Sequence, residues 1–199
     1  MQLARLRASG FCTQPQDIDL AKPSSWMEPT VAREANGQEH PIPTRGHHLL
    51  CDADGKFPVN LNGWEEDVLD RETGRAGFVA WFRNPSRASR ESLAVAYEIS
   101  NITKMVRPDF IFFNKRSDGS TTAAIVDPHG FHLGDALPKL RGLANYAEKH
   151  GSHYQRIEGV AKAGDKLRVL DLTRDTVRKA IAEATDAKAL YEGAHASDY

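Results

Sequence analysis

Two apolar runs of strand length, each bounded by an aspartate, constrain the fold of this chain more than any other feature. The first run, Phe110–Phe113, follows Asp109, and the second, Ala123–Val126, precedes Asp127. The turn-like segment 114–120 between them predicts a β-hairpin at the centre of a sheet. Because antiparallel pairing brings the start of one strand beside the end of the other, we expect both carboxylates at the same end of the hairpin.

Two neighbouring carboxylates are typical ligands of a hard divalent cation. Proteins bind Mg²⁺ through one or two carboxylates together with waters and phosphate oxygens, and the ion can then activate water for hydrolysis of a phosphodiester. Asp109 and Asp127 therefore predict a site for Mg²⁺, with Mn²⁺ as a second candidate metal. Pro-Asp and Asp-Pro are also ordinary boundary sequences of strands. The pair alone leaves both interpretations open.

The motifs around the two aspartates resemble those of a nuclease family. In chain order they are Trp64-Glu65-Glu66, Trp81-Phe82-Arg83-Asn84-Pro85, Pro108-Asp109-Phe110, Val126-Asp127-Pro128-His129 and the segment 136–151. Together they are similar to the C-terminal endonuclease-like domain of type III restriction enzyme Res subunits and of DEAD/DEAH-box helicase-nuclease proteins, within the PD-(D/E)xK superfamily. The similarity spans residues 46–172.

The resemblance implies a fold and a set of site residues. The implied fold is restriction-endonuclease-like and of the α/β (α+β) class, with a central mixed sheet of four to five strands flanked by helices. Asp109 and Asp127 would hold the metal, and Glu65 or Glu66, on a helix before the sheet, would complete the site, although acids are also common in the first turn of a helix. The family's lysine, two positions after the second acid, is His129 here. A neutral imidazole accepts a proton but carries no permanent charge, so Lys139 is the candidate for the missing cation.

Two other functions remain open at this point. If the change to His129 has abolished catalysis, the chain is an inactive nuclease-like module that binds DNA or contacts another subunit. Alternatively, Asp127 and His129 form the acid–base pair of a small-molecule enzyme on an unrelated α/β fold, for which we expect a compact apolar pocket.

The distribution of charge favours DNA as a partner only locally. The whole chain has a net charge of −1 and a pI near 6.7, unlike a constitutively basic nucleic-acid scaffold. Between residues 75 and 116, however, eight basic residues stand against three acidic ones. Such a surface can bind phosphates. The candidate DNA-binding residues are Arg83, Arg87, Arg90 and Arg107, although a solvated charged loop explains several of them equally well.

The motifs that the sequence lacks bear on its partners and on its cellular compartment. It has no phosphate-binding Gly-x-x-x-x-Gly-Lys-Ser/Thr loop and no Asp-Glu-Ala-His-like segment, so ATP would act only through a separate motor domain. The resemblance implies an ATPase/helicase region or a methylation subunit as partner. The two cysteines form no zinc-binding spacing with the histidines. With no signal-like or membrane-spanning apolar run, we expect a cytoplasmic protein without a membrane partner.

The chain divides into three predicted parts. Residues 1–45 are polar and rich in proline and predict a linker or a poorly ordered arm, 46–192 form the nuclease-like domain, and 193–199 form a frayed tail. Within the domain we predict helices at 63–71, 138–150 and 175–191, further central strands at 77–83 and 93–97, and a strand pair at 154–160 and 166–172.

Overall fold

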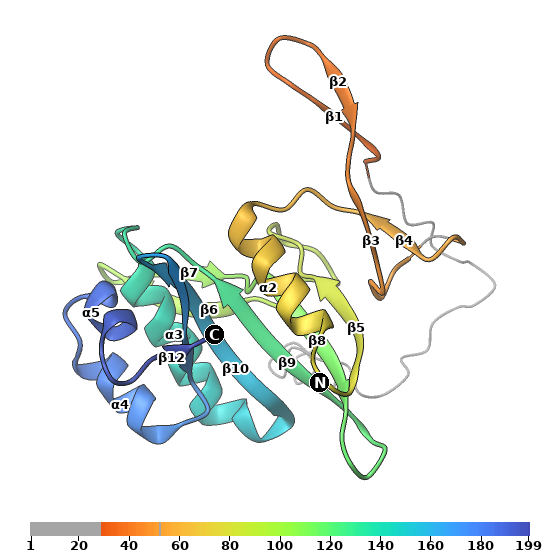
Figure 1. The fold of residues 1–199 in the computed structure, drawn as a ribbon. Coiled ribbons are helices and arrows are strands. Elements are labelled where there is room, and N and C mark those ends of the chain that lie inside the picture. The colour runs from red at the N-terminus through yellow and green to blue at the C-terminus, as the bar shows by residue number, and fades with distance from the viewer. Residues whose placement is uncertain (1–28, 52) are drawn as a thin grey trace. The chain divides into compact units, whose positions relative to one another are not determined.

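The computed structural model describes residues 29–51 and 53–199 and divides into two compact units, Met1–Asn62 and Gly63–Tyr199 (Figure 1). The described part of the first unit consists of short hairpins: β1 (Val31–Arg33) pairs with β2 (Glu39–Pro41), and β3 (Thr44–Gly46) pairs with β4 (Lys56–Pro58). Much of the predicted arm, residues 1–28, lies outside the described residues. All predicted site residues belong to the second unit.

A six-stranded mixed sheet, in the order β12-β11-β10-β9-β8-β5, forms the centre of the second unit. The strands are β5 (Phe78–Arg83), β8 (Phe110–Lys115), β9 (Thr121–Pro128), β10 (Tyr154–Ala163), β11 (Lys166–Asp171) and β12 (Ser197–Asp198). Neighbours are antiparallel except β9 and β10, which run parallel. Helix α3 (Ala136–His150) connects these two strands. The predicted class, a mixed sheet flanked by helices, is confirmed, but the sheet has six strands and not the predicted four to five, because β12 adds to its edge.

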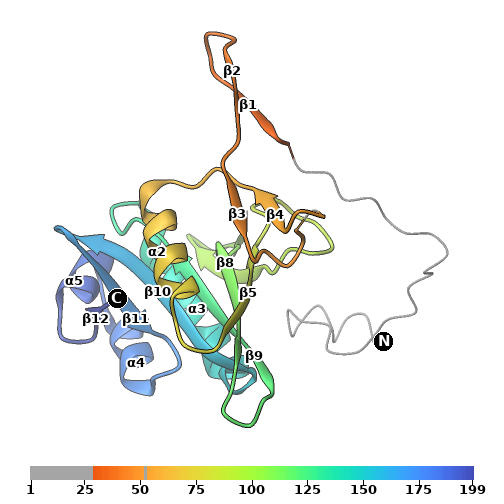
Figure 2. The ribbon, with the colours of Figure 1, turned by 45° about the vertical axis from the view of Figure 1, so that its right-hand side comes forward.

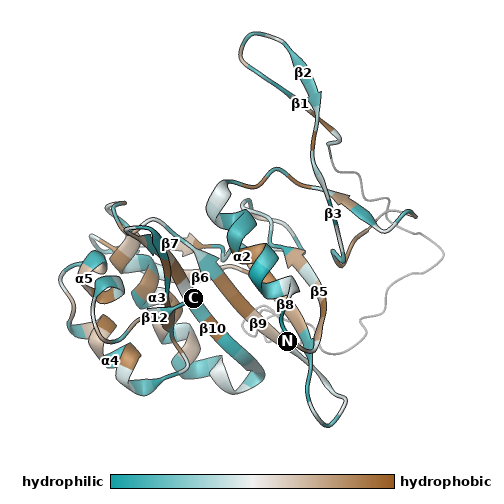
Figure 3. Ribbon diagram, viewed as in Figure 1, coloured by the Kyte–Doolittle hydropathy of each residue, from teal (hydrophilic) through white to brown (hydrophobic). Residues whose placement is uncertain are grey.

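The predicted central hairpin is confirmed as β8–β9. Its register pairs Phe110 with Val126 at one end and Lys115 with Thr121 at the other. Gly119 has a φ of +82° in the connecting turn, a left-handed conformation that favours glycine. Every side chain from Ala124 to Pro128 is buried, as a strand covered on both faces requires. Figure 3 shows this apolar character along β9.

Helices cover both faces of the sheet. Helix α2 (Gly63–Thr73) packs on β5 and β9, whereas α3 and α5 (Ala187–Glu192) contact β10 (Figure 2). Adjacent residues of β10 show the two faces: Glu158 lies in an ion-pair cluster with Glu72 of α2, and the backbone of Gly159 faces the side chains of Leu140 and Tyr191. Residues that alternate along a strand point to opposite faces.

One predicted central strand forms a separate sheet instead. The segment predicted at 93–97 becomes β6 (Val95–Ile99), which pairs only with β7 (Ile102–Val106) among the described strands. The reason is the two-residue turn Ser100-Asn101, in which both residues have positive φ and fold the chain back on itself. This hairpin packs against α3.

The C-terminal segment also differs from the prediction. Instead of one helix, α4 (Asp175–Glu183) and α5 are separated by a short break, and Asp186 caps α5 by accepting a hydrogen bond from the N–H of Ala189 at 3.0 Å. Where the sequence predicts a frayed tail, β12 pairs with β11, and Asp198 binds Lys166 at 2.7 Å. The C-terminal segment therefore packs as part of the second unit.

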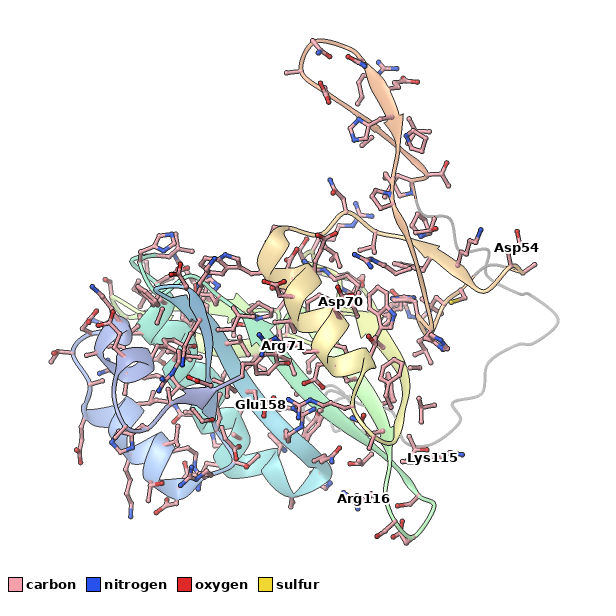
Figure 4. All side chains as sticks on the ribbon, viewed as in Figure 1. Asp54, Asp70, Arg71, Lys115, Arg116 and Glu158 are labelled. Carbon is pink, nitrogen blue, oxygen red and sulfur yellow. The ribbon has the colours of Figure 1, made fainter. Side chains whose placement is uncertain are left out.

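A buried ion cluster lies between α2 and the sheet. The side chain of Glu72 is fully buried, and Arg156 Nη2 contacts its Oε2 at 2.6 Å, while Nη1 contacts Glu158 Oε2 at 2.6 Å. The hydroxyl of Tyr199 donates to Glu72 Oε1 at 2.7 Å. Burial opposes the charge of Glu72, but the hydrogen bonds and charge of Arg156 outweigh it and hold the pKa of Glu72 below its usual value. Figure 4 labels Glu158 in this region.

Among the described helices, none combines the length and apolar character needed to cross a membrane.

Candidate active site

Asp109 and Asp127 meet at one end of the β8–β9 hairpin, as the predicted pairing requires. They follow directly on the pair Phe110–Val126, and the backbone N–H of Asp109 donates to Oδ1 of Asp127 at 3.2 Å. Asp127 is only 4% exposed, whereas the side chain of Asp109 is 25% exposed. The two carboxyl groups therefore differ in access: one is enclosed by the sheet and helices, and the other is reached by solvent.

Burial makes both groups unusually weak acids. Removal from water raises the pKa of Asp127 to about 7, and the nearby charge of Asp109 acts in the same direction. Burial likewise raises the pKa of Asp109 to about 6, although the positive charge of Arg83 opposes this rise. Carboxyl groups with pKa values shifted toward neutrality are common in functional sites. The two carboxyl groups therefore gain or lose their protons near neutral pH, where most enzymes work.

Arg83 binds two of the predicted site acids. Its Nη2 lies 2.6 Å from Oε1 of Glu65 on α2 and 3.1 Å from Oδ1 of Asp109. The guanidinium group also lies over the ring of Phe110, with 4.7 Å from Cζ to the ring centroid. The structure thus brings Glu65 to the aspartates through a shared cation. Arg83 is thus engaged within the site, and its predicted contact with DNA stays a prediction.

Lys139 reaches the site from the first turn of α3. Its Nζ lies 3.4 Å from Nε2 of His129 and 3.0 Å from Oδ2 of Asp135. Its positive charge lowers the pKa of both Asp109 and Asp127, opposing the effect of their burial. Burial, together with the charge of Lys139, lowers the pKa of His129. At neutral pH, His129 is therefore a neutral imidazole whose Nε2 faces an ammonium group.

Two contributors to this site were absent from the predicted set. Asp135 anchors Lys139, and the hydroxyl of Tyr97 donates to Oδ2 of Asp135 at 3.3 Å. The spacing of Asp135 and Lys139, four residues apart at the start of a helix, is a sequence signal for such a pair. The second contributor, Tyr191 of α5, lines a cavity together with Asp127, His129 and Lys139. Nothing in the local sequence indicates that contact.

The remaining predicted DNA-binding residues lie on the chain between β5 and β8. Arg87 and Arg90 are exposed in the loop that follows β5. Arg107 is half-buried, and its Nε has no hydrogen-bond partner among the described residues. Arg87 and Arg90 are therefore available to an external anion, whereas Arg107 is held at the end of β7 close to the Pro108-Asp109 segment.

Asp109 and Asp127 are the candidate carboxylate ligands for a metal ion. Among residues 29–51 and 53–199, no group of three or more His, Cys, Asp and Glu side chains is arranged to hold one. Mg²⁺, however, commonly uses one or two carboxylates and completes its shell with waters and phosphate oxygens. Asp109 and Asp127 satisfy that smaller requirement, with Arg83 competing for Asp109. The pair fits Mg²⁺ in donor chemistry.

The size of the cavity beside Asp127 and His129 tests the alternative that the chain is a small-molecule enzyme. The space bounded by Asp127 and His129 is about 10 Å³, roughly the room for one water molecule. A larger cavity of about 360 Å³ is lined by residues 131–134, 137 and 185–188, and neither Asp127 nor His129 borders it. Of these two cavities, the one that Asp127 and His129 border is therefore too small for a substrate, and the larger one lies away from them.

Comparison with known proteins identifies the family. A model described as the YagJ family matches residues 46–199. Protein YagJ of Escherichia coli (strain K12) is 49% identical over 187 residues, which cover 94% of this chain and 76% of the relative. No solved structure matches the chain. Neither of the two names states an activity. On the extent of the family match and the identity to this relative, the chain belongs to the YagJ family.

Proposed function

We propose that the second unit is a metal-dependent DNA endonuclease domain with a restriction-endonuclease-like fold, related to the nuclease domains of type III restriction enzymes and helicase-nuclease proteins. It hydrolyses phosphodiester bonds. The observation that carries the proposal is the joining of Asp109 and Asp127 by a 3.2 Å hydrogen bond at the end of a buried hairpin. Glu65 and Lys139 approach this pair from helices before and after the three antiparallel strands β5, β8 and β9.

The protein groups have distinct roles in this proposal. Asp109 and Asp127 are the residues that would hold Mg²⁺ or Mn²⁺. When bound, the ion supplies an activated water and positive charge for the phosphate. Lys139 provides the permanent cation beside the acids and binds a phosphate oxygen. His129, neutral and half-buried, accepts a proton at Nε2 once the ammonium group of Lys139 turns toward the phosphate.

Arg83 gives the proposed site a closed resting arrangement. Its guanidinium group contacts Glu65 and Asp109 together and reduces the repulsion between the two acids. A cation that binds Asp109 competes directly with this contact. Arg87 and Arg90, exposed beyond the same strand, then contact the DNA backbone, and this binding weakens as salt rises.

Plasmid nicking with Mg²⁺ or Mn²⁺ tests the proposal. The wild-type chain is compared with Asp109→Asn and Asp127→Asn, and Asp118→Asn is the matched control, because Asp118 is an exposed acid in the turn at the opposite end of the same hairpin. We expect each site variant to lose at least about 10–100-fold of the activity, the range for a weakened metal site. The control keeps wild-type activity. Equal cleavage by all four proteins rejects the assignment.

A second candidate function is supported by Arg83 and His129. Arg83 already contacts both Glu65 and Asp109, and His129 stands where the PD-(D/E)xK superfamily has its lysine. Both features also suit a nuclease-like module that has lost catalysis. Such a module binds DNA, or contacts an ATPase/helicase region or a methylation subunit. DNA retardation without Mn²⁺ binding, measured by calorimetry on the same preparation, supports this function over cleavage. Mn²⁺ binding lost in Asp127→Asn supports the nuclease, even if cutting needs a motor partner supplied separately.

A further inference from the structure

The hydroxyl of Tyr191 is a buried polar group without an evident structural use. Tyr191 is 1% exposed, and its Oη has no hydrogen-bond partner among the described residues. Its ring packs against Phe131, with 6.2 Å between the ring centroids. A phenylalanine would make the same apolar contact. Burying an unpaired hydroxyl is unfavourable, so this group requires a hydrogen-bond partner.

Gly159 shows where the hydroxyl points. A Cβ at this position would lie 2.8 Å from Oη of Tyr191 and 2.9 Å from Cδ2 of Leu140. Because Gly159 pairs with Asp127 in the parallel strands β10 and β9, the two residues face the same side of the sheet. The missing side chain therefore leaves room for the phenol beside Asp127. Burial, reinforced by the charge of Asp127, raises the pKa of Tyr191 above its usual value.

The same place contains a cavity of molecular dimensions. Its volume is about 10 Å³, close to the minimum needed for one water molecule. Asp127, His129, Lys139 and Tyr191 supply its polar groups, and Phe131, Ala136, Leu140 and Leu143 supply its apolar wall. A buried water commonly makes two to four hydrogen bonds, and these polar groups meet that requirement.

We propose that Tyr191 is a positioning residue of the Asp127 site, donating its phenolic hydrogen to a single buried water that also contacts the carboxyl group of Asp127. The water fixes the orientation of this carboxyl group from the side opposite Asp109. Its role in catalysis rests on the nuclease function proposed above, but its effect on Asp127 does not. The C-terminal helix α5 thereby contributes to a site whose other members lie between residues 65 and 139.

The cavity lining shows what removal of this hydroxyl changes. In Tyr191→Phe the water loses one of its hydrogen-bond partners, whereas Asp127, His129 and Lys139 stay in place. We therefore expect the variant to hold the water less firmly and to change the surroundings of the Asp127 carboxyl group.

NMR of the aspartate-labelled chain at one fixed pH tests the proposal without any need for activity. Tyr191→Phe is compared with Tyr154→Phe, which removes a buried hydroxyl that contacts Tyr146 near the start of β10, away from Gly159. In the wild-type protein a long-lived water should give a cross-peak with the Tyr191 ring. We expect Tyr191→Phe to lose this cross-peak and to shift the carboxyl ¹³C resonance of Asp127, and Tyr154→Phe to change neither.

The outcomes separate this proposal from the nuclease function. The absence of a long-lived water beside the Tyr191 ring, or an equal shift of the Asp127 resonance in both variants, overturns the role of Tyr191. If wild-type protein cuts DNA, Tyr191→Phe should slow cleavage and Tyr154→Phe should not. If it does not cut, the nuclease function fails, and loss of the water in Tyr191→Phe alone still establishes the hydrogen bond through water.

Discussion

The backbone N–H of Asp109 donates to the Oδ1 atom of Asp127, so each aspartate of the site constrains the other without sharing a proton between side chains. The hydrogen bond favours the charged form of Asp127, but burial outweighs it and places the pKa near 7. Asp127 is therefore held in position independently of its charge, because an oxygen of the neutral carboxyl group can accept the same hydrogen bond. The amide oxygen of an asparagine could accept it as well.

Replacing Asp127 with Asn should change the dependence of stability on pH. The folded pKa, about 7, lies above the ordinary aspartate value of 3.8, so the native state binds this proton more tightly than the unfolded state does. Its stabilisation is fully present below pH 3.8 and is lost as the pH rises through 7. We expect Asp127→Asn to lack this loss and to gain roughly 2–4 kcal/mol on the wild type between pH 4 and pH 8, measured by urea unfolding.

A matched exposed acid provides the control for that experiment. Asp67 lies on the exposed side of α2, and Asp67→Asn should follow the wild-type curve at both pH values. A wild-type protein whose stability does not fall relative to Asp127→Asn as the pH is raised would contradict the raised pKa of Asp127.

Arg83→Gln should destabilise the chain more at high pH than at low pH. Removing the guanidinium group leaves Glu65 and Asp109 without their shared cation, at an expected cost of about 1–3 kcal/mol, because the site is only partly screened by solvent. At pH 5, Asp109, whose pKa is about 6, is mostly protonated and needs the cation less. Unfolding curves at pH 5 and 8 measure the difference, with the exposed Arg90→Gln as control. Equal losses at both pH values contradict the ion-pair role.

Arg156→Met should cost more than any exposed ion pair. The variant leaves the fully buried Glu72 without its principal partner, and breaking a buried pair in this way costs about 3–5 kcal/mol. Adding Glu72→Leu should recover part of the loss, because the unpaired charge is then removed. Chemical unfolding of the single and double variants measures the coupling. If the losses of stability caused by Arg156→Met and by Glu72→Leu simply add in the double variant, the two residues act independently.

Gly142→Ala should destabilise the chain although alanine favours helices. A Cβ at Gly142 of α3 would lie 2.6 Å from Cβ of Tyr97 and 2.9 Å from the carbonyl oxygen of Ala96, so that α3 and β6 must separate. Overpacking of this kind costs about 1–3 kcal/mol, which exceeds the gain in helix propensity of about 1 kcal/mol. Thermal unfolding measures the net loss. Gly134→Ala, with open space around its Cβ, is the control.

The elements with strong apolar patterns were predictable from sequence. The β8–β9 hairpin is bounded by clear turn residues, and α3 carries apolar residues at helical spacing with a proline in its first turn. Strand β7 has no such signal, because four of its five residues are exposed. Its pairing with β6 alone depends on the turn geometry at Ser100-Asn101 and on packing against α3, neither of which local periodicity reports.

The site was predictable only where its residues lie in motifs. Asp109 and Asp127 follow from strand pairing, and the approach of Lys139 follows from the helix that starts soon after β9. The contact of Arg83 with Glu65 joins a strand end to a helix eighteen positions earlier, and it depends on how α2 packs. Tyr191 borders the same cavity as Asp127, and a side chain at Gly159 would collide with its hydroxyl, so this part of the site depends on three distant segments.

The pairing of β12 with β11 has a consequence for association between molecules. An uncovered β11 would offer a row of free backbone groups on which a strand of another molecule could form. Instead, Ser197 and Asp198 occupy part of that edge, and Asp198 binds both Lys166 and Arg168. A two-residue edge flanked by charges is a poor template for further strand addition, so Ser197 and Asp198 protect this edge of the sheet, although not the edge at β5, against growth into aggregates.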